Sequence, residues 1–191
     1  MTWTNYLQHF DEILSGTGTE APYDDPHFME YTRLNHSRMN RWLKTGKLTA
    51  DVMEHLRRID RTQRWILITE PWCGDAAHIV PFIQLMAQQN QHVQFEIQLR
   101  DSGSEIDQYL TKGAKAVPIL IIRDEDGKDL AMWGPRPKAA QQLFQDMKEA
   151  GLHLDDQKVR LQQWYNDDNG SSMQQEFVSL LAGIQQCETV S

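Results

Sequence analysis

The hydrophobic residues in the first third of the chain fall into three separate runs at helical spacing. Apolar side chains recur every three or four residues before Ser15, between Pro26 and Gly46, and after Thr49. Pro26 is typical of a first helical position, and Thr49 can accept a hydrogen bond from the backbone at the start of a helix. We therefore expect three helices in residues 1–61, each with an apolar face that the rest of the chain must cover.

The middle of the chain alternates between apolar runs typical of strands and patterns typical of helices. Residues 65–69 are aromatic and β-branched without polar alternation, which indicates a strand covered on both faces. Residues 93–99 alternate apolar and polar side chains, as in a strand with one covered face. Further strands are expected at 119–122 and 129–133, and helices are expected from Ala76 onward, at 104–112 and at 138–149.

Residues 151–191 contain two more helical patterns, around 157–165 and 174–184. We expect them to form a short polar helical hairpin that caps the rest of the fold. The whole pattern places the chain in the α/β class. It divides the chain into an N-terminal helical extension (1–61), a central domain (62–150) and this C-terminal cap.

The charge of the chain argues against two classes of partner. The formal net charge is −8 and the pI is about 5.3, so neither nucleic acid nor an anionic membrane surface is expected to bind. No apolar run approaches the roughly 18 residues that span a bilayer, and residues 1–10 lack the pattern of a signal peptide. Two cysteines provide no disulfide framework, which fits a reducing compartment. We therefore expect a cytoplasmic protein.

Cys73 lies where the strand at 65–69 gives way to the next helix. The first turn of a helix leaves backbone N–H groups unpaired and carries the positive end of the helix dipole, which favours a thiolate. Glu70 and Asp75 would raise the pKa of Cys73, whereas the dipole and Arg136 would lower it. The sequence leaves the direction of the shift open. Asp75 also has a purely structural interpretation, as a carboxylate that favours the dipole.

The residues around this cysteine resemble the start of the Trp-Cys-Gly-Pro-Cys site of thioredoxins. The matching positions are Trp72-Cys73-Gly74, Pro81 in the following helix, Val117-Pro118 as the family's cis-proline, the hairpin turn at 124–127, and Gly134. The resemblance covers roughly residues 62–150. It implies a thioredoxin-like fold, with a central mixed sheet flanked by helices. It also implies a substrate groove bordered by Val117, Pro118, Gly134 and Arg136.

The chain departs from the thioredoxin pattern at two positions. Ala76 replaces the second cysteine, so that the four residues read Cys73-Gly74-Asp75-Ala76. Leu67 stands where thioredoxins carry a buried aspartate that helps to move the resolving proton. Both parts of the internal resolving step are therefore missing. The chain also resembles a smaller thioredoxin-like group with a Cys-Gly-Asp-Ala site and a Trp-Gly-Pro-Arg-Pro segment, here residues 133–137.

The resemblance leaves two classes of function open. In the first, Cys73 is the catalytic residue of a monothiol exchanger that attacks client protein disulfides or thiol adducts. An external low-molecular-weight thiol then acts as co-substrate and resolves the complex. In the second, the chain is a non-catalytic module that holds an extended peptide in the cis-proline groove. Arg136, held between two prolines, could grip a substrate carboxylate or pack on Trp133.

No other residues in the sequence indicate a cofactor or a metal. His27, His36 and His55 have no cysteine or regular carboxylate spacing around them, so packed or solvated histidines are the simpler interpretation. Cys187, near the end of the chain, is more simply a bystander than a partner of Cys73. A distant resolving role for Cys187 nevertheless stays open.

Overall fold

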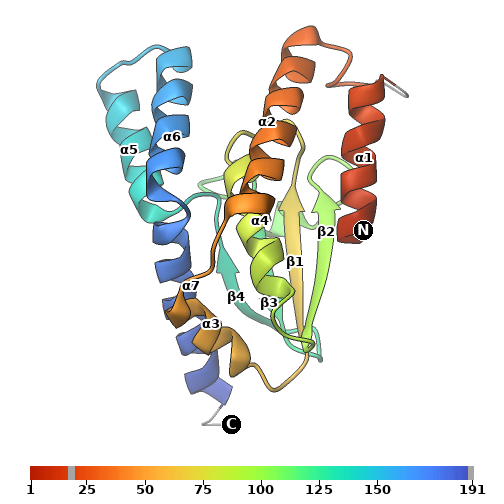
Figure 1. Cartoon of the computed structure of the whole chain (residues 1–191), viewed down its shortest axis with the longest axis vertical. Helices are drawn as coiled ribbons and strands as arrows, with labels where there is room; N and C mark the ends of the chain where they lie inside the picture. The colour runs from red at the N-terminus through yellow and green to blue at the C-terminus, as the bar shows by residue number, and fades with distance from the viewer. Residues whose placement is uncertain (17–19, 189–191) are drawn as a thin grey trace.

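A four-stranded mixed sheet forms the centre of the structure, a computed structural model that describes residues 1–16 and 20–188 (Figure 1). The strands are β1 (Gln63–Thr69), β2 (Val93–Leu99), β3 (Ile119–Arg123) and β4 (Asp129–Trp133), in the spatial order β2-β1-β3-β4. β1 is parallel to β2 and antiparallel to β3, and β3 is antiparallel to β4. The α/β class and the mixed sheet that the sequence predicted are confirmed.

The helices lie on either side of this sheet and beyond its ends (Figure 1). They are α1 (Trp3–Ser15), α2 (Pro26–Thr45), α3 (Ala50–Arg57), α4 (Ala76–Ala87), α5 (Lys138–Glu149), α6 (Leu154–Asp168) and α7 (Ser171–Glu188). The expected starts of α2 and α3 are confirmed. Asp25 directly precedes Pro26, the first residue of α2, and its side chain accepts a hydrogen bond from the backbone N–H of His27. At the start of α3, the Thr49 side chain accepts one from the backbone N–H of Val52.

β1 is the most deeply buried strand, and both of its faces are covered. The side chains of Trp65, Ile66, Leu67 and Ile68 are fully buried. The Trp65 ring contacts Phe177 of α7, with ring centroids 6.1 Å apart, and Phe177 also contacts Trp133 of β4. A strand between two apolar layers needs hydrophobic residues at every position, which explains the absence of polar alternation in its sequence.

The two C-terminal helices, α6 and α7, are longer than the predicted ranges of 157–165 and 174–184. The sequence predicted a polar hairpin, but α7 has an apolar buried face. α7 buries Met173, Phe177, Leu181 and Ile184 at helical spacing. α5 and α6 pack against one another, whereas α7 reaches the sheet and α3. The side chain of Cys187 lies outside the described part of the structure, so its proposed roles stay predictions.

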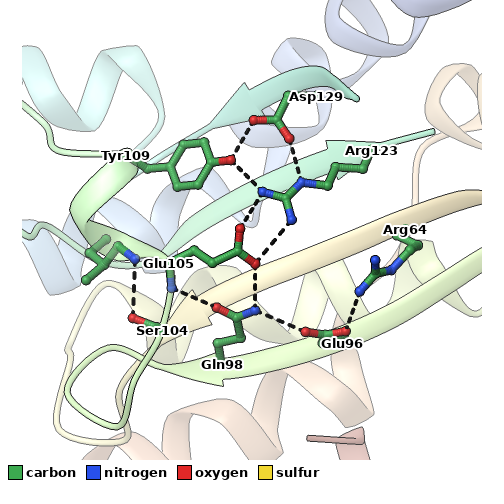
Figure 2. A network of polar contacts seen from close by, with 9 residues as sticks. Arg64, Glu96, Gln98, Ser104, Glu105, Tyr109, Arg123 and Asp129 are labelled. Carbon is green, nitrogen blue, oxygen red and sulfur yellow. Dashed lines mark hydrogen bonds and ion pairs between the residues drawn. The ribbon is translucent and has the colours of Figure 1, made fainter. Parts of the chain in front are cut away.

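The prediction of a helix over residues 104–112 is wrong. Within this range the structure has only a short 3₁₀ turn, at Ile106–Gln108. The side chains on either side of this turn bond to the sheet (Figure 2). Arg123 donates to both oxygens of Glu105, to Asp129 at 2.6 Å and to the Tyr109 hydroxyl at 2.6 Å. Its side chain is only 13% exposed. The backbone N–H of Glu105 donates to Gln98 Oε1 of β2, and that of Ile106 donates to Ser104 Oγ, so side-chain oxygens serve as acceptors where a helix would use backbone carbonyls.

Candidate functional site

Cys73 lies in the short loop between β1 and α4, and its side chain is buried, with 7% exposed. Its Sγ donates a hydrogen bond to the backbone carbonyl of Val117, 3.3 Å away. The peptide bond that follows, Val117–Pro118, is cis. The cysteine and the proline loop are therefore neighbours in space, although 44 residues separate Cys73 from Val117.

The resting form of Cys73 is the neutral thiol. Burial, and to a smaller extent the nearby Asp75 carboxylate, raises the pKa of the thiol to about 12. The backbone N–H groups of Ala76 and Asp75 and the Arg136 guanidinium lower the pKa, but their effect is the smaller one. A group with that pKa is almost entirely protonated at neutral pH. The sequence left the direction of the Cys73 pKa shift open, and in the structure the pKa is raised.

Asp75 forms a buried ion pair with Arg136. Nε and Nη2 of Arg136 donate to Asp75 Oδ2 at 2.8 and 2.7 Å, and the two side chains are only 19% and 11% exposed. Asp75 lies at the start of α4 but makes no capping hydrogen bond to this helix. Arg136 stacks on Phe144, 4.4 Å from the ring centroid, and not on Trp133. The charge of Arg136 is thus balanced within the protein.

The C-terminal helix α6 reaches the site from one side. The Tyr165 hydroxyl donates to Asp75 Oδ1 at 2.8 Å, and the Tyr165 ring stacks on His78 with centroids 4.6 Å apart. His78 Nδ1 accepts from Trp42 Nε1 at 2.9 Å, and Nε2 lies 2.6 Å from Gln162 Oε1. Because an indole N–H can only donate, the neutral His78 ring carries its proton on Nε2. Burial lowers the pKa of His78 to about 4.

Acid is expected to destabilise the protein through His78. A histidine whose pKa is lower in the folded protein than its usual 6.5 favours unfolding as the pH falls, and the loss is complete near pH 4. Because the side chain is buried, we expect the free energy of unfolding to fall by about 2 kcal/mol between pH 7.5 and pH 5 through this group. Urea denaturation of wild type and His78→Asn at both pH values measures it. Equal pH dependence in the two proteins would contradict the assignment.

The N-terminal extension reaches the site from the other side. Asn35 of α2 donates from Nδ2 to the backbone carbonyl of Pro71 at 3.1 Å, and Asn35 is buried. The Phe28 ring meets Trp72 edge to face, with centroids 5.9 Å apart. Two residues directly before Cys73 are therefore held by α2. Trp72 Nε1 has no hydrogen-bond partner among the described residues.

Glu70, at the end of β1, is buried and joins the loop to two other segments. Its Oε1 accepts from the backbone N–H of Asp101 at 3.1 Å, and its Oε2 accepts from the Tyr23 hydroxyl at 3.5 Å. Burial raises the pKa of Glu70, and the hydrogen bond from Asp101 opposes the shift. Arg100 lies over the Trp72 ring, 4.6 Å from its centroid. The residues from Glu70 to Trp72 are thus anchored from several directions.

Gly134 brings the loop after β4 against the cis-proline. Its φ is +129°, and a Cβ added there would lie 2.3 Å from the carbonyl oxygen of Pro118. Gly134 and Arg136 line a groove of about 380 Å³, whereas Val117 and Pro118 are buried and do not line it. Gly74 lies close to α6, because an added Cβ would lie 3.4 Å from Gln162 Nε2.

The sequence interpretation missed the residues that hold the site from outside the central domain. Asn35, Gln162 and Tyr165 belong to no motif, and each is a single polar or aromatic residue within an amphipathic helix. Tyr165 follows Leu161 at helical spacing, so its burial was predictable. Its hydrogen bond to Asp75, 90 residues away, had no signal in the sequence.

The sheet order, the cis-proline and the cysteine beside it define a protein of the thioredoxin-like fold. A family model described as thioredoxin matches residues 23–148, which is more than half of the chain. The chain therefore belongs to the thioredoxin family. No curated protein matches it in sequence.

Two solved structures resemble this one in fold. A protein of unknown function from Pseudomonas aeruginosa is 19% identical, with a TM-score of 0.56 over 82% of this chain and 85% of that chain. An HIV epitope scaffold is also 19% identical, with a TM-score of 0.56 over 95% of this chain and 98% of that chain. At this identity the likeness shows the fold alone.

Residues 1–16 and 20–188 contain no group of three or more His, Cys, Asp and Glu side chains placed to hold a metal ion. No helix in the same ranges is long and apolar enough to cross a membrane.

Proposed function

We propose that this protein is a monothiol thiol-disulfide exchanger in which Cys73 is the nucleophile. The observation that supports the proposal is the contact between Cys73 Sγ and the carbonyl of Val117, directly before the cis-proline. A sulfur in this place lies beside the backbone that an extended substrate would pair with. Its position just before α4 also lets backbone N–H groups stabilise the thiolate.

The reaction proceeds in three exchange steps. The Cys73 thiolate attacks one sulfur of a client disulfide, forming a new S–S bond, and the other client sulfur leaves as a thiolate that takes a proton from water. An external thiolate then attacks the Cys73 sulfur, so that the client leaves as a thiolate and Cys73 is joined to the external thiol. A second external thiolate attacks the external sulfur of this disulfide and releases Cys73. Because Ala76 carries no sulfur, the second step needs this external thiol.

A binding module without catalysis is the second candidate, and the burial of Cys73 favours it. A thiol that is 7% exposed, with a pKa raised to about 12, reacts slowly in the resting structure. In that case the hydrogen bond from Cys73 to Val117 would hold the proline loop in place. The two candidates differ in whether Cys73 forms a mixed disulfide at all.

Treatment with a small disulfide is expected to add one thiol to Cys73. Since the pKa of Cys73 is raised to about 12, the rate of addition should increase about tenfold for each pH unit between pH 7 and pH 10. The adduct should persist until an external thiol is added, because Ala76 cannot resolve it. Intact-mass spectrometry at timed intervals measures both the adduct and its rate.

The matched control for this measurement is Cys187→Ser, with Cys73→Ser as the negative control. Cys187→Ser should react as wild type does, and Cys73→Ser should form no adduct at the site. An unmodified Cys73 at pH 9, after complete reaction of a denatured sample, would support the binding module instead. A bond between Cys73 and Cys187 would contradict the need for an external thiol.

A further inference from the structure

A groove of about 380 Å³ lies beside the Cys73 site, between the turn at Thr111 and the start of α5. Three of its lining residues are cations, Lys112, Arg136 and Lys138, and three are glutamines of α5. No carboxylate lines it. In a chain with a formal net charge of −8, a concave surface of this composition points to an anionic ligand. Its volume is that of a small-molecule site.

Two of the three cations in the groove are free to bind a ligand. Arg136 is paired with Asp75, and its Nη1 also donates to Gln141 at 3.3 Å. Lys112 and Lys138 are exposed, and neither forms an ion pair with any described residue. By contrast, Lys115, three residues after Lys112, is paired with Asp107 at 2.8 Å. The groove thus presents two uncompensated ammonium groups.

The carboxylate nearest to the start of α5 is already engaged. Glu176 of α7 accepts from the backbone N–H of Lys138 at 2.7 Å and from Trp133 Nε1 at 2.8 Å. Glu176 therefore bonds to α5 and β4, and it does not line the groove. The side chain of Lys138 is left without a charged partner among the described residues.

Two residues in the wall of the groove contact the Cys73 site. Gly134, in its wall, lies against the Pro118 carbonyl, and the preceding carbonyl, of Val117, accepts the hydrogen bond from Cys73. Arg136, also in its wall, is bonded to Asp75, two residues after Cys73. Cys73, Val117 and Pro118 do not line the groove, so a ligand whose charged part lay in it would reach the sulfur by passing over Gly134 and the cis-proline loop.

We infer that this groove binds the carboxylates of an acidic, peptide-sized thiol, which is the external thiol of the exchange reaction. The inference rests on the proposed function of Cys73. Lys112 and Lys138 hold the carboxylates, and the ligand sulfur forms the mixed disulfide with Cys73. Nε2 of Gln142 and of Gln145 already donates to Asp146 and Glu149, which leaves the two amide oxygens to accept from the peptide N–H groups of the ligand. The groove therefore selects acidic thiols over neutral ones.

The test compares glutathione disulfide with its tetraethyl ester, which has the same S–S bond but no free carboxylates. We expect the ratio of their rates of addition to Cys73 to fall about tenfold in the double variant Lys112→Gln/Lys138→Gln, at low salt. Lys115→Gln, which lies outside the groove, should keep the wild-type ratio. High salt should reduce the ratio in wild type and have little effect in the double variant.

A binding measurement separates failure of this inference from failure of the exchange function. S-methylglutathione, which cannot exchange, should shift the backbone NMR signals of Gln141 and Gln142 in Cys73→Ser, and the two lysine substitutions should abolish the shifts. Addition to Cys73 with a ratio unaffected by the lysines would overturn the groove assignment alone. Absence of addition with either disulfide would overturn the exchange function, and the NMR shifts would then decide the groove by themselves.

Discussion

Asp75→Asn is expected to make the protein less stable and Cys73 more reactive. The substitution leaves Arg136 without a charged partner in a place where both side chains are largely buried. Breaking such a pair from one side costs about 3 kcal/mol of folding free energy. The same change removes a carboxylate that raises the pKa of Cys73 and keeps the cation that lowers it. We expect the rate of adduct formation at pH 7.5 to increase roughly tenfold, the effect of one pKa unit.

Arg136→Gln is the matched control, because it breaks the same ion pair from the other side. Its stability should fall by a similar amount, about 3 kcal/mol, measured by urea denaturation. Its Cys73 should react more slowly than that of wild type, because Asp75 then acts on the thiol without the opposing cation. If both variants react faster, loosening of the site controls the rate, and the electrostatic explanation fails.

Gly134→Ala is expected to cost at least about 3 kcal/mol of folding free energy. The φ of +129° is a conformation that residues with a Cβ rarely adopt, and the new Cβ would lie 2.3 Å from the Pro118 carbonyl oxygen. That oxygen belongs to buried backbone, so it cannot move as a flexible side chain would. Thermal and urea denaturation measure the loss.

Gly103→Ala separates the two causes of that loss. Gly103 also has a positive φ, +78°, but an added Cβ would meet no atom within 4 Å. Its substitution should cost only about 1 kcal/mol, the price of the backbone conformation. A loss in Gly134→Ala no larger than this would show that the two loops are not in close contact.

Elements defined by local chemistry were predictable from the sequence. α2 and α3 begin where Pro26 and Thr49 indicated, and the buried strand at 65–69 lies at the centre of the sheet. The helix at 104–112 failed for a physical reason, since Glu105 and Tyr109 on either side of the 3₁₀ turn bond to Arg123 of the sheet. Local periodicity carries no information about such partners.

The site was predictable in its position but not in its electrostatics. Cys73, Val117-Pro118 and Gly134 fall in register with a known motif, and the structure brings them together. The pKa of Cys73 depends on how deeply the sulfur is buried and on the partner of Asp75, which are properties of the packed fold. No short-range pattern could reveal that Tyr165 would bond to Asp75.

Two helices from outside the central domain hold the loop that carries Cys73. Asn35 of α2 bonds to one side of this loop, and Tyr165 of α6 bonds to the other. Because the sulfur is buried and protonated in this structure, the rate of a reaction there depends on two factors, the opening of the loop and the ionisation of the thiol. Base acts on the second factor. A partner that bound the outer surface of α2 or α6 and released one fastening would increase the first factor, with no change in the chemistry at the sulfur.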